Sequence, residues 1–71
     1  METKRQLTRI TADFTPEAYE TLSTVSESLQ TTKAEALRKA LGLLNFVIKH
    51  RNQGWKLVLE KDDDRKEIVT L

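Results

Sequence analysis

One stretch near the start of the chain limits what the rest can fold into. Residues 7–14 read Leu-Thr-Arg-Ile-Thr-Ala-Asp-Phe. In an extended chain successive side chains alternate, so that one face carries Thr8, Ile10, Ala12 and Phe14 and the other carries Leu7, Arg9, Thr11 and Asp13. The next two residues, Thr15-Pro16, favour a helix start, because a hydroxyl residue caps the helix and proline suits its first position. The sequence therefore predicts a strand that leads directly into a helix.

The open edge of that strand needs a pairing partner, either the far end of this chain or the same strand of a second copy. A chain of 71 residues buries only about 60% of its unfolded surface and is marginal as a monomer. The sequence has no cysteine, so neither disulfides nor thiolate metal sites can stabilise it. Oligomerisation is the remaining way to enlarge the core, and we expect a homodimer.

Two helices are predicted after this strand. From Pro16 to about Gln30, apolar residues recur at the spacing of one helical face. Thr32-Lys33-Ala34-Glu35 then matches a capping box, and this second helix should end near Gly54. Gly42 within it either lets two backbones approach closely or is a tolerated flaw. His50 should be an exposed cation at the helix end.

The second helix is predicted to have an unusually wide apolar surface. Two adjacent stripes make it up: Ala36, Ala40, Leu43 and Val47 in one, and Leu37, Leu41, Leu44 and Ile48 in the other. One short helix of the same chain cannot cover both stripes. We therefore expect a dimer core that combines the apolar strand face with this helix, formed by Ile10, Ala12, Phe14, Leu37, Leu41 and Leu44.

The last part of the chain has the composition of a β-hairpin. Residues 55–60 and 66–71 are rich in strand formers, and the segment between them, 61–65, has turn composition. Its three consecutive aspartates lack the alternate ligands, central glycine and distal glutamate of a calcium-binding EF-hand loop. We expect three parts in all: a flexible basic arm at 1–6, a folded domain at 7–54, and a hairpin extension at 55–71.

Several function classes are disfavoured. The sequence shows no nucleophile-base pair, no phosphate-binding glycine loop and no metal-ligand cluster, so we expect neither an enzyme nor a bound cofactor or metal. No apolar run approaches the roughly 20 residues that span a bilayer, and the N-terminus does not resemble a signal peptide. The absence of cysteine is consistent with a reducing compartment. We expect a cytoplasmic protein.

What remains is a recognition surface: the polar strand face and the start of the second helix. If two copies of the strand paired antiparallel, their polar faces would form a ribbon that fits the major groove and carries Arg9, Thr11 and Asp13. Asp13 is the weakest of these candidates, because phosphates repel a carboxylate, and it could instead serve the turn into the helix. The start of the second helix, at Thr32 with Lys33 beside it, is a candidate phosphate site. Lys4 and Arg5 either contact phosphates or are simply solvated.

These elements resemble the ribbon-helix-helix family of Arc-, MetJ- and CopG-type repressors and antitoxins. The resemblance rests on the run 9–16, the amphipathic helix after it and the run 32–41, and it covers residues 5 to about 50. It implies an intertwined homodimer whose paired N-terminal strands enter the major groove, with base contacts from Arg9, Thr11 and Asp13. It also implies a phosphate clamp at Thr31, Thr32 and Lys33.

Two features depart from that family. Gln30 stands where the family commonly has glycine between the helices, and the hairpin lies outside the shared core. The sequence thus predicts a sequence-specific DNA-binding protein: a transcriptional repressor, a plasmid-copy regulator or an antitoxin with a toxin or other protein partner. The alternative is a monomeric helix-plus-sheet module that binds another protein, in which the hairpin pairs with the N-terminal strand of its own chain.

Overall fold

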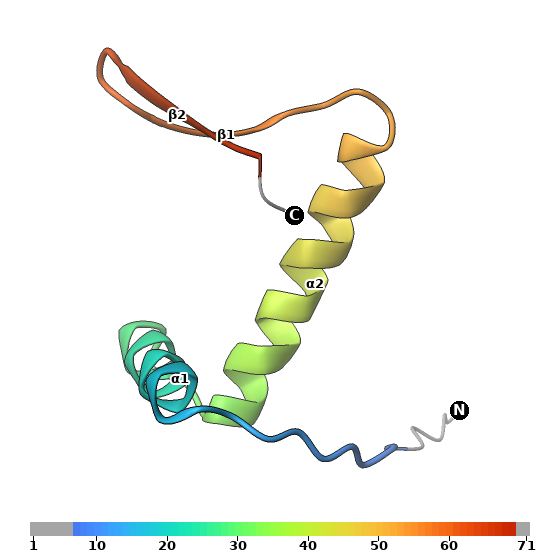
Figure 1. The fold of residues 1–71 in the computed structure, drawn as a ribbon, viewed down its shortest axis with the longest axis vertical. Helices are drawn as coiled ribbons and strands as arrows, with labels where there is room; N and C mark the ends of the chain where they lie inside the picture. The colour runs from blue at the N-terminus through green and yellow to red at the C-terminus, as the bar shows by residue number, and fades with distance from the viewer. Residues whose placement is uncertain (1–6, 70–71) are drawn as a thin grey trace.

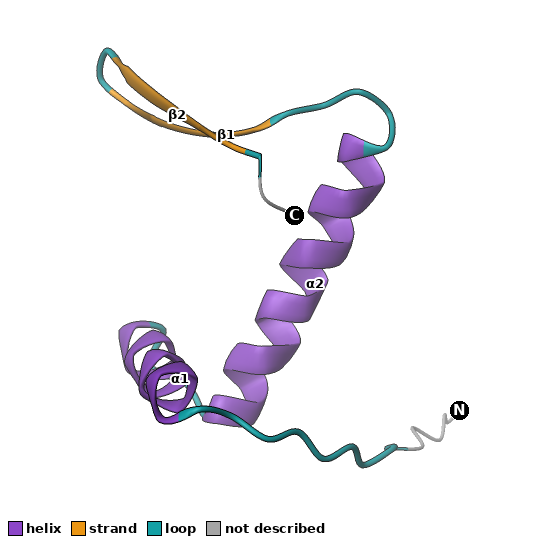
Figure 2. Ribbon diagram, in the orientation of Figure 1, coloured by secondary structure: helices purple, strands orange, loops and turns teal. Residues whose placement is uncertain are grey.

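The computed structural model describes residues 7–69 and has two helices followed by two strands (Figures 1 and 2). Helix α1 spans Pro16–Ser28 and helix α2 spans Lys33–Arg51. Strands β1, Leu57–Lys61, and β2, Asp64–Ile68, pair antiparallel. The chain is a small α+β protein, as expected at that coarse level. No helix within the described residues is long and apolar enough to cross a membrane.

Both helices begin where the sequence predicts. The Thr15 hydroxyl accepts a hydrogen bond from the Ala18 amide at 3.1 Å, and Pro16 occupies the first helical position. The Thr32 hydroxyl likewise accepts from the Glu35 amide at 3.1 Å. The reciprocal half of the capping box does not form, because the Glu35 carboxylate accepts from Arg38 Nη1 at 3.0 Å. Each helix start is therefore fixed by one threonine side chain.

The turn between the helices has a standard geometry carried by an unusual residue. The Thr31 amide donates to the Ser26 carbonyl at 2.9 Å and the Gln30 amide donates to the Glu27 carbonyl at 3.0 Å. This pair of bonds defines a Schellman motif, whose left-handed position glycine normally fills. Here Gln30 adopts a φ of 53°. The left-handed cap therefore forms with glutamine in place of glycine, at the steric cost of a Cβ atom in that conformation.

Gln30→Gly is expected to stabilise the protein by about 1 kcal/mol, because glycine removes the Cβ clash of the left-handed conformation and loses only part of that gain to chain entropy. Urea denaturation at one fixed protein concentration measures the change. Gln53→Gly is the matched control, since Gln53 follows α2 and does not have a positive φ. An equal gain in both variants would contradict the backbone explanation.

The C-terminal hairpin forms, with a tighter turn than predicted. Helix α2 ends at Arg51, and Gly54 reverses the chain with a φ of 98°. The strand register pairs Leu57 with Ile68 and Lys61 with Asp64, leaving a loop of Asp62 and Asp63 alone. Asp62 has a φ of 52°, which aspartate tolerates better than most residues. The second strand therefore starts at 64 instead of 66, and the predicted strand residues 70 and 71 lie outside the described part.

The predicted N-terminal strand is not formed in this single chain. Residues 7–15 lack regular secondary structure, and the described sheet contains only β1 and β2. The β-α-α order is therefore not observed, and neither is the pairing of the hairpin with residues 7–14 on which the monomeric alternative depended. Residues 7–14 pass the N-terminal end of α2 on their way into α1, whereas the hairpin follows the C-terminal end of α2 (Figure 1). A strand exists only through hydrogen bonds to a partner, and no partner strand within the described chain lies beside residues 7–14.

The apolar core is very small for a folded chain. Among the described residues only Ala36, at 2% exposure, and Ser26 are buried, where α1 meets α2. The accessible surface is 6947 Å², about 2,400 Å² more than a compact protein of this mass exposes. The radius of gyration is 15.7 Å, against about 11 Å for a compact domain. In the wide apolar surface predicted for α2, Ala36 is buried and Val47 is half-buried, but the other six residues of the two stripes are exposed.

Candidate nucleic-acid interface

Residues 7–14 pass the N-terminal end of α2 before the chain enters α1 (Figure 1). All of their side chains are exposed, including the three predicted base-contacting residues Arg9, Thr11 and Asp13. Their apolar neighbours are exposed as well: Ile10 at 84% and Phe14 at 42%. An exposed arginine and threonine need no explanation in a monomer, but an isoleucine and a phenylalanine beside them do.

An open cavity of about 650 Å³ lies between this segment and α2. Its lining combines the strand residues Leu7, Thr8, Arg9 and Ile10 with the helix residues Ala34, Leu37, Arg38 and Leu41. Three predicted dimer-core residues, Ile10, Leu37 and Leu41, therefore surround one hollow. The other three, Ala12, Phe14 and Leu44, do not line it, although they are exposed too. Five of the eight lining residues are apolar, and no segment of the described chain fills the hollow.

The start of α2 has the features of an anion site. Thr32 uses its hydroxyl on the Glu35 amide, so the amides of Lys33 and Ala34 in the first turn are without partners inside the helix, as at any helix start. The positive end of the helix dipole adds to the charge of Lys33. Thr31 is half-buried and its amide is used within the turn. Of Thr31, only the side chain is available to a phosphate.

Lys33 has a neighbour that the sequence pattern does not indicate. Its ammonium lies 5.4 Å from the centre of the Tyr19 ring, a cation–π distance. From the sequence alone, Tyr19 only widens the apolar face of the first helix. Fourteen positions separate the two residues, so no local pattern could have indicated the contact. In the structure, Tyr19 restrains the cation at the helix start. The predicted phosphate contacts Lys4 and Arg5 lie outside the described residues.

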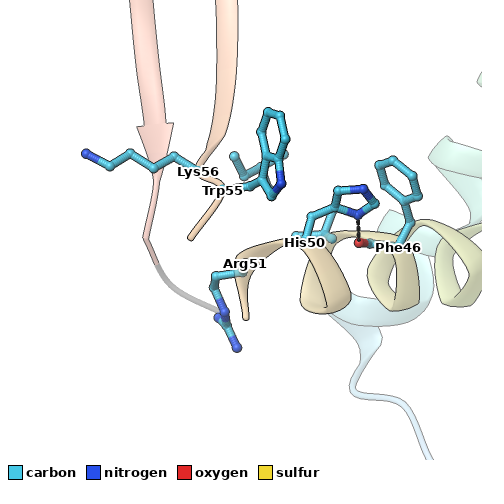
Figure 3. Close-up of a pocket in the computed structure, with 7 residues that line it drawn as sticks. Phe46, His50, Arg51, Trp55 and Lys56 are labelled. Carbon is cyan, nitrogen blue, oxygen red and sulfur yellow. Dashed lines mark hydrogen bonds between the residues drawn. The ribbon is translucent and has the colours of Figure 1, made fainter. Parts of the chain in front are cut away.

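A second hollow lies at the other end of α2, where the chain turns into the hairpin (Figure 3). It measures about 290 Å³. His50 is half-buried there, with Nδ1 2.8 Å from the Phe46 carbonyl oxygen and its ring 4.1 Å from the Phe46 ring and 6.1 Å from that of Trp55. His50 therefore lies at the helix end as predicted, but it is half-buried between the Phe46 and Trp55 rings and not exposed.

Comparisons with known proteins add no relatives. No protein-family model, curated protein or solved structure matches this chain significantly.

Proposed function

We propose that the protein is a homodimeric, sequence-specific DNA-binding protein of the ribbon-helix-helix type. In this dimer, residues 7–14 of two chains pair as an antiparallel ribbon, and the ribbon enters the major groove. The regulatory role proposed for it is that of a transcriptional repressor, a plasmid-copy regulator or an antitoxin. Catalysis, a cofactor and a membrane have no part in the proposal.

One observation carries the proposal: an unpaired, alternating segment lies beside an uncovered apolar helix face. The surface excess of about 2,400 Å² is the amount that one partner buries in a large obligate homodimer interface. Pairing two copies of residues 7–14 would satisfy their backbone groups. The same pairing would turn Ile10, Ala12 and Phe14 towards Leu37, Leu41 and Leu44. A dimer would therefore both pair residues 7–14 and cover the apolar face of α2.

The pairing would also give the polar face its chemistry. Arg9 can bind a guanine edge through two hydrogen bonds, and Thr11 can donate or accept a hydrogen bond or contact a thymine methyl. Both residues would repeat about the two-fold axis of the ribbon. Lys33, restrained by Tyr19 at the start of α2, would bind a phosphate beside the groove. Base contacts would then determine which DNA sequence is preferred, and phosphate contacts would fix the position of the protein on the duplex.

A monomeric protein-binding module is the weaker candidate. Its sheet required the hairpin to pair with residues 7–14 of the same chain, but residues 7–14 lie near the N-terminal end of the 19-residue α2 and the hairpin follows its C-terminal end (Figure 1). At 1.5 Å per residue that helix is about 28 Å long. The single chain also leaves its apolar surface open, which a stable monomer rarely does. We therefore retain the dimer as the proposed form.

Selection from a pool of random DNA duplexes tests this function. The full-length protein is expected to enrich an inverted repeat, because a symmetric dimer binds a two-fold-related site. Binding should be strong at the enriched site and should weaken as the salt concentration rises. A scrambled duplex of the same length and composition is the control. Equal binding of both duplexes at every salt concentration would contradict sequence-specific recognition.

A further inference from the structure

The two strands of the hairpin differ sharply in character. β1 begins Leu57-Val58-Leu59, so it is apolar on both faces, whereas β2 begins with four charged residues, Asp64 to Glu67. Edge strands of stable sheets carry charge, and strands apolar on both faces are usually interior. β2 therefore has the composition of a protected edge. β1 has that of an interior strand, although in the described chain nothing pairs with its outer side.

The register shows which backbone groups of β1 point outwards. In a two-residue hairpin loop, the flanking pair is hydrogen-bonded across the turn, and here that pair is Lys61 and Asp64. Hydrogen-bonding direction alternates along a strand. Lys61, Leu59 and Leu57 therefore direct their amides and carbonyls to β2. Val58 and Glu60 direct theirs away from it, and so offer hydrogen bonds to a further strand.

We infer that this outer edge pairs antiparallel with β1 of a second copy, with Val58 facing Val58 at the two-fold axis. Only residues whose groups both point outwards can form the hydrogen-bonded pairs, so even-numbered residues must face even-numbered ones. With Val58 at the axis, Lys56 faces Glu60 of the other copy, and Leu57 faces Leu59. Opposite charges and apolar pairs then match at every position from 56 to 60.

Two neighbouring registers also place even-numbered residues opposite even-numbered ones, but their side chains match less well. Moving the axis by one residue towards the turn places Leu57 opposite Lys61 and Val58 opposite Glu60. Moving it the other way places Lys56 opposite Val58. Each buries an apolar side chain against a charge, so the register centred on Val58 is favoured.

This pairing would complete an apolar sheet face. Leu57, Leu59 and Ile68 share the face opposite to that of Val58, and Leu59 is 59% exposed in the single chain. Two hairpins side by side would place these residues next to those of the second copy. A lone two-stranded hairpin is only marginally stable in water, and four strands with an apolar face are more stable. The other possible occupant, residues 7–14 of the same chain, is at the far end of α2 (Figure 1).

A cysteine placed at the axis tests the pairing directly, because the natural sequence has none. In the full-length Val58→Cys protein the two Cα atoms would lie about 5.5 Å apart, within the range that a disulfide bridges. Mild oxidation is expected to yield a two-chain species rapidly. The matched control is Glu67→Cys, since Glu67 pairs with Val58 across the hairpin. Its two copies would be three strand spacings, about 14 Å, apart and should cross-link at least tenfold more slowly.

A charge swap tests the register. On the Val58→Cys background, Lys56→Glu and Glu60→Lys should each slow cross-linking by about two- to tenfold, since like charges would then face each other at two places. The double exchange should restore the rate. Equal rates for the Val58→Cys and Glu67→Cys proteins would overturn the inference, as would a disulfide formed preferentially between Val58→Cys and Ile10→Cys chains. No DNA is involved, so the result is independent of the proposed DNA binding.

Discussion

Leu41→Asp is expected to unfold the protein and not to release a stable monomer. Leu41 is 68% exposed in the single chain, and an aspartate at such a position in a monomer changes the free energy of unfolding by no more than about 0.5 kcal/mol. In the proposed dimer the same carboxylate would be buried between two chains, at a cost of several kcal/mol per copy. Circular dichroism with sedimentation of the same samples measures folding and mass together.

Asn45→Asp is the control for that substitution. It adds the same single negative charge to α2 at an exposed position outside both apolar stripes, and it should leave the helical signal and the mass unchanged. If Leu41→Asp were as well folded as Asn45→Asp, residue 41 would face solvent in the native protein. The proposed core would then be wrong.

Arg9→Ala is expected to weaken binding at the selected DNA site by about 1 to 3 kcal/mol for each arginine–base interaction removed. Two symmetry-related interactions would disappear from each dimer, so the total decrease in affinity could reach a thousandfold or more. The preference at the matching base pairs should relax, while non-specific binding should largely persist. Titrations against the selected duplex and single-base variants of it measure both effects.

Lys33→Ala is the comparison for Arg9→Ala, because it removes a proposed phosphate contact in place of a base contact. It should weaken binding to all duplexes alike and flatten the salt dependence by about 1 for each lysine, or about 2 for a dimer. Arg9→Ala would thus change the sequence preference, whereas Lys33→Ala would change the salt dependence of binding. A sequence preference unchanged by Arg9→Ala would mean that residues 7–14 do not read the DNA.

The helices could be predicted because their signals are local. Thr15-Pro16 and Thr32 to Glu35 are short patterns whose effect depends on residues three or four positions away, and both helix starts are observed. The hairpin could be predicted as an element but not in detail. The loop contains only Asp62 and Asp63, although turn composition extends over residues 61–65. The two cannot be distinguished by composition, because the charged residues of an edge strand are also typical of turns.

Other features could not be read from the sequence. Whether residues 7–14 form a strand depends on a partner for their backbone, which no alternation of side chains supplies. The contact of Lys33 with Tyr19 and that of His50 with Trp55 each form where a turn brings separate segments together. The exposure of Arg9, Thr11 and Asp13 agrees with the predicted site, but exposure does not distinguish a base contact from an ordinary surface residue.

The core of the single chain is nearly absent, so if the proposed dimer is obligate, the abundance of the chain decides how much of it is folded. In an obligate dimer, each tenfold increase in total protein adds about 1.4 kcal/mol to the stability of the assembled form. At low abundance, most chains would be unfolded and open to proteolysis. At high abundance, they would be assembled and protected. Because assembly requires two chains, the amount of active protein would rise with the square of the free chain concentration. In such a regulator, doubling the concentration of free chains would raise the concentration of the active dimer fourfold.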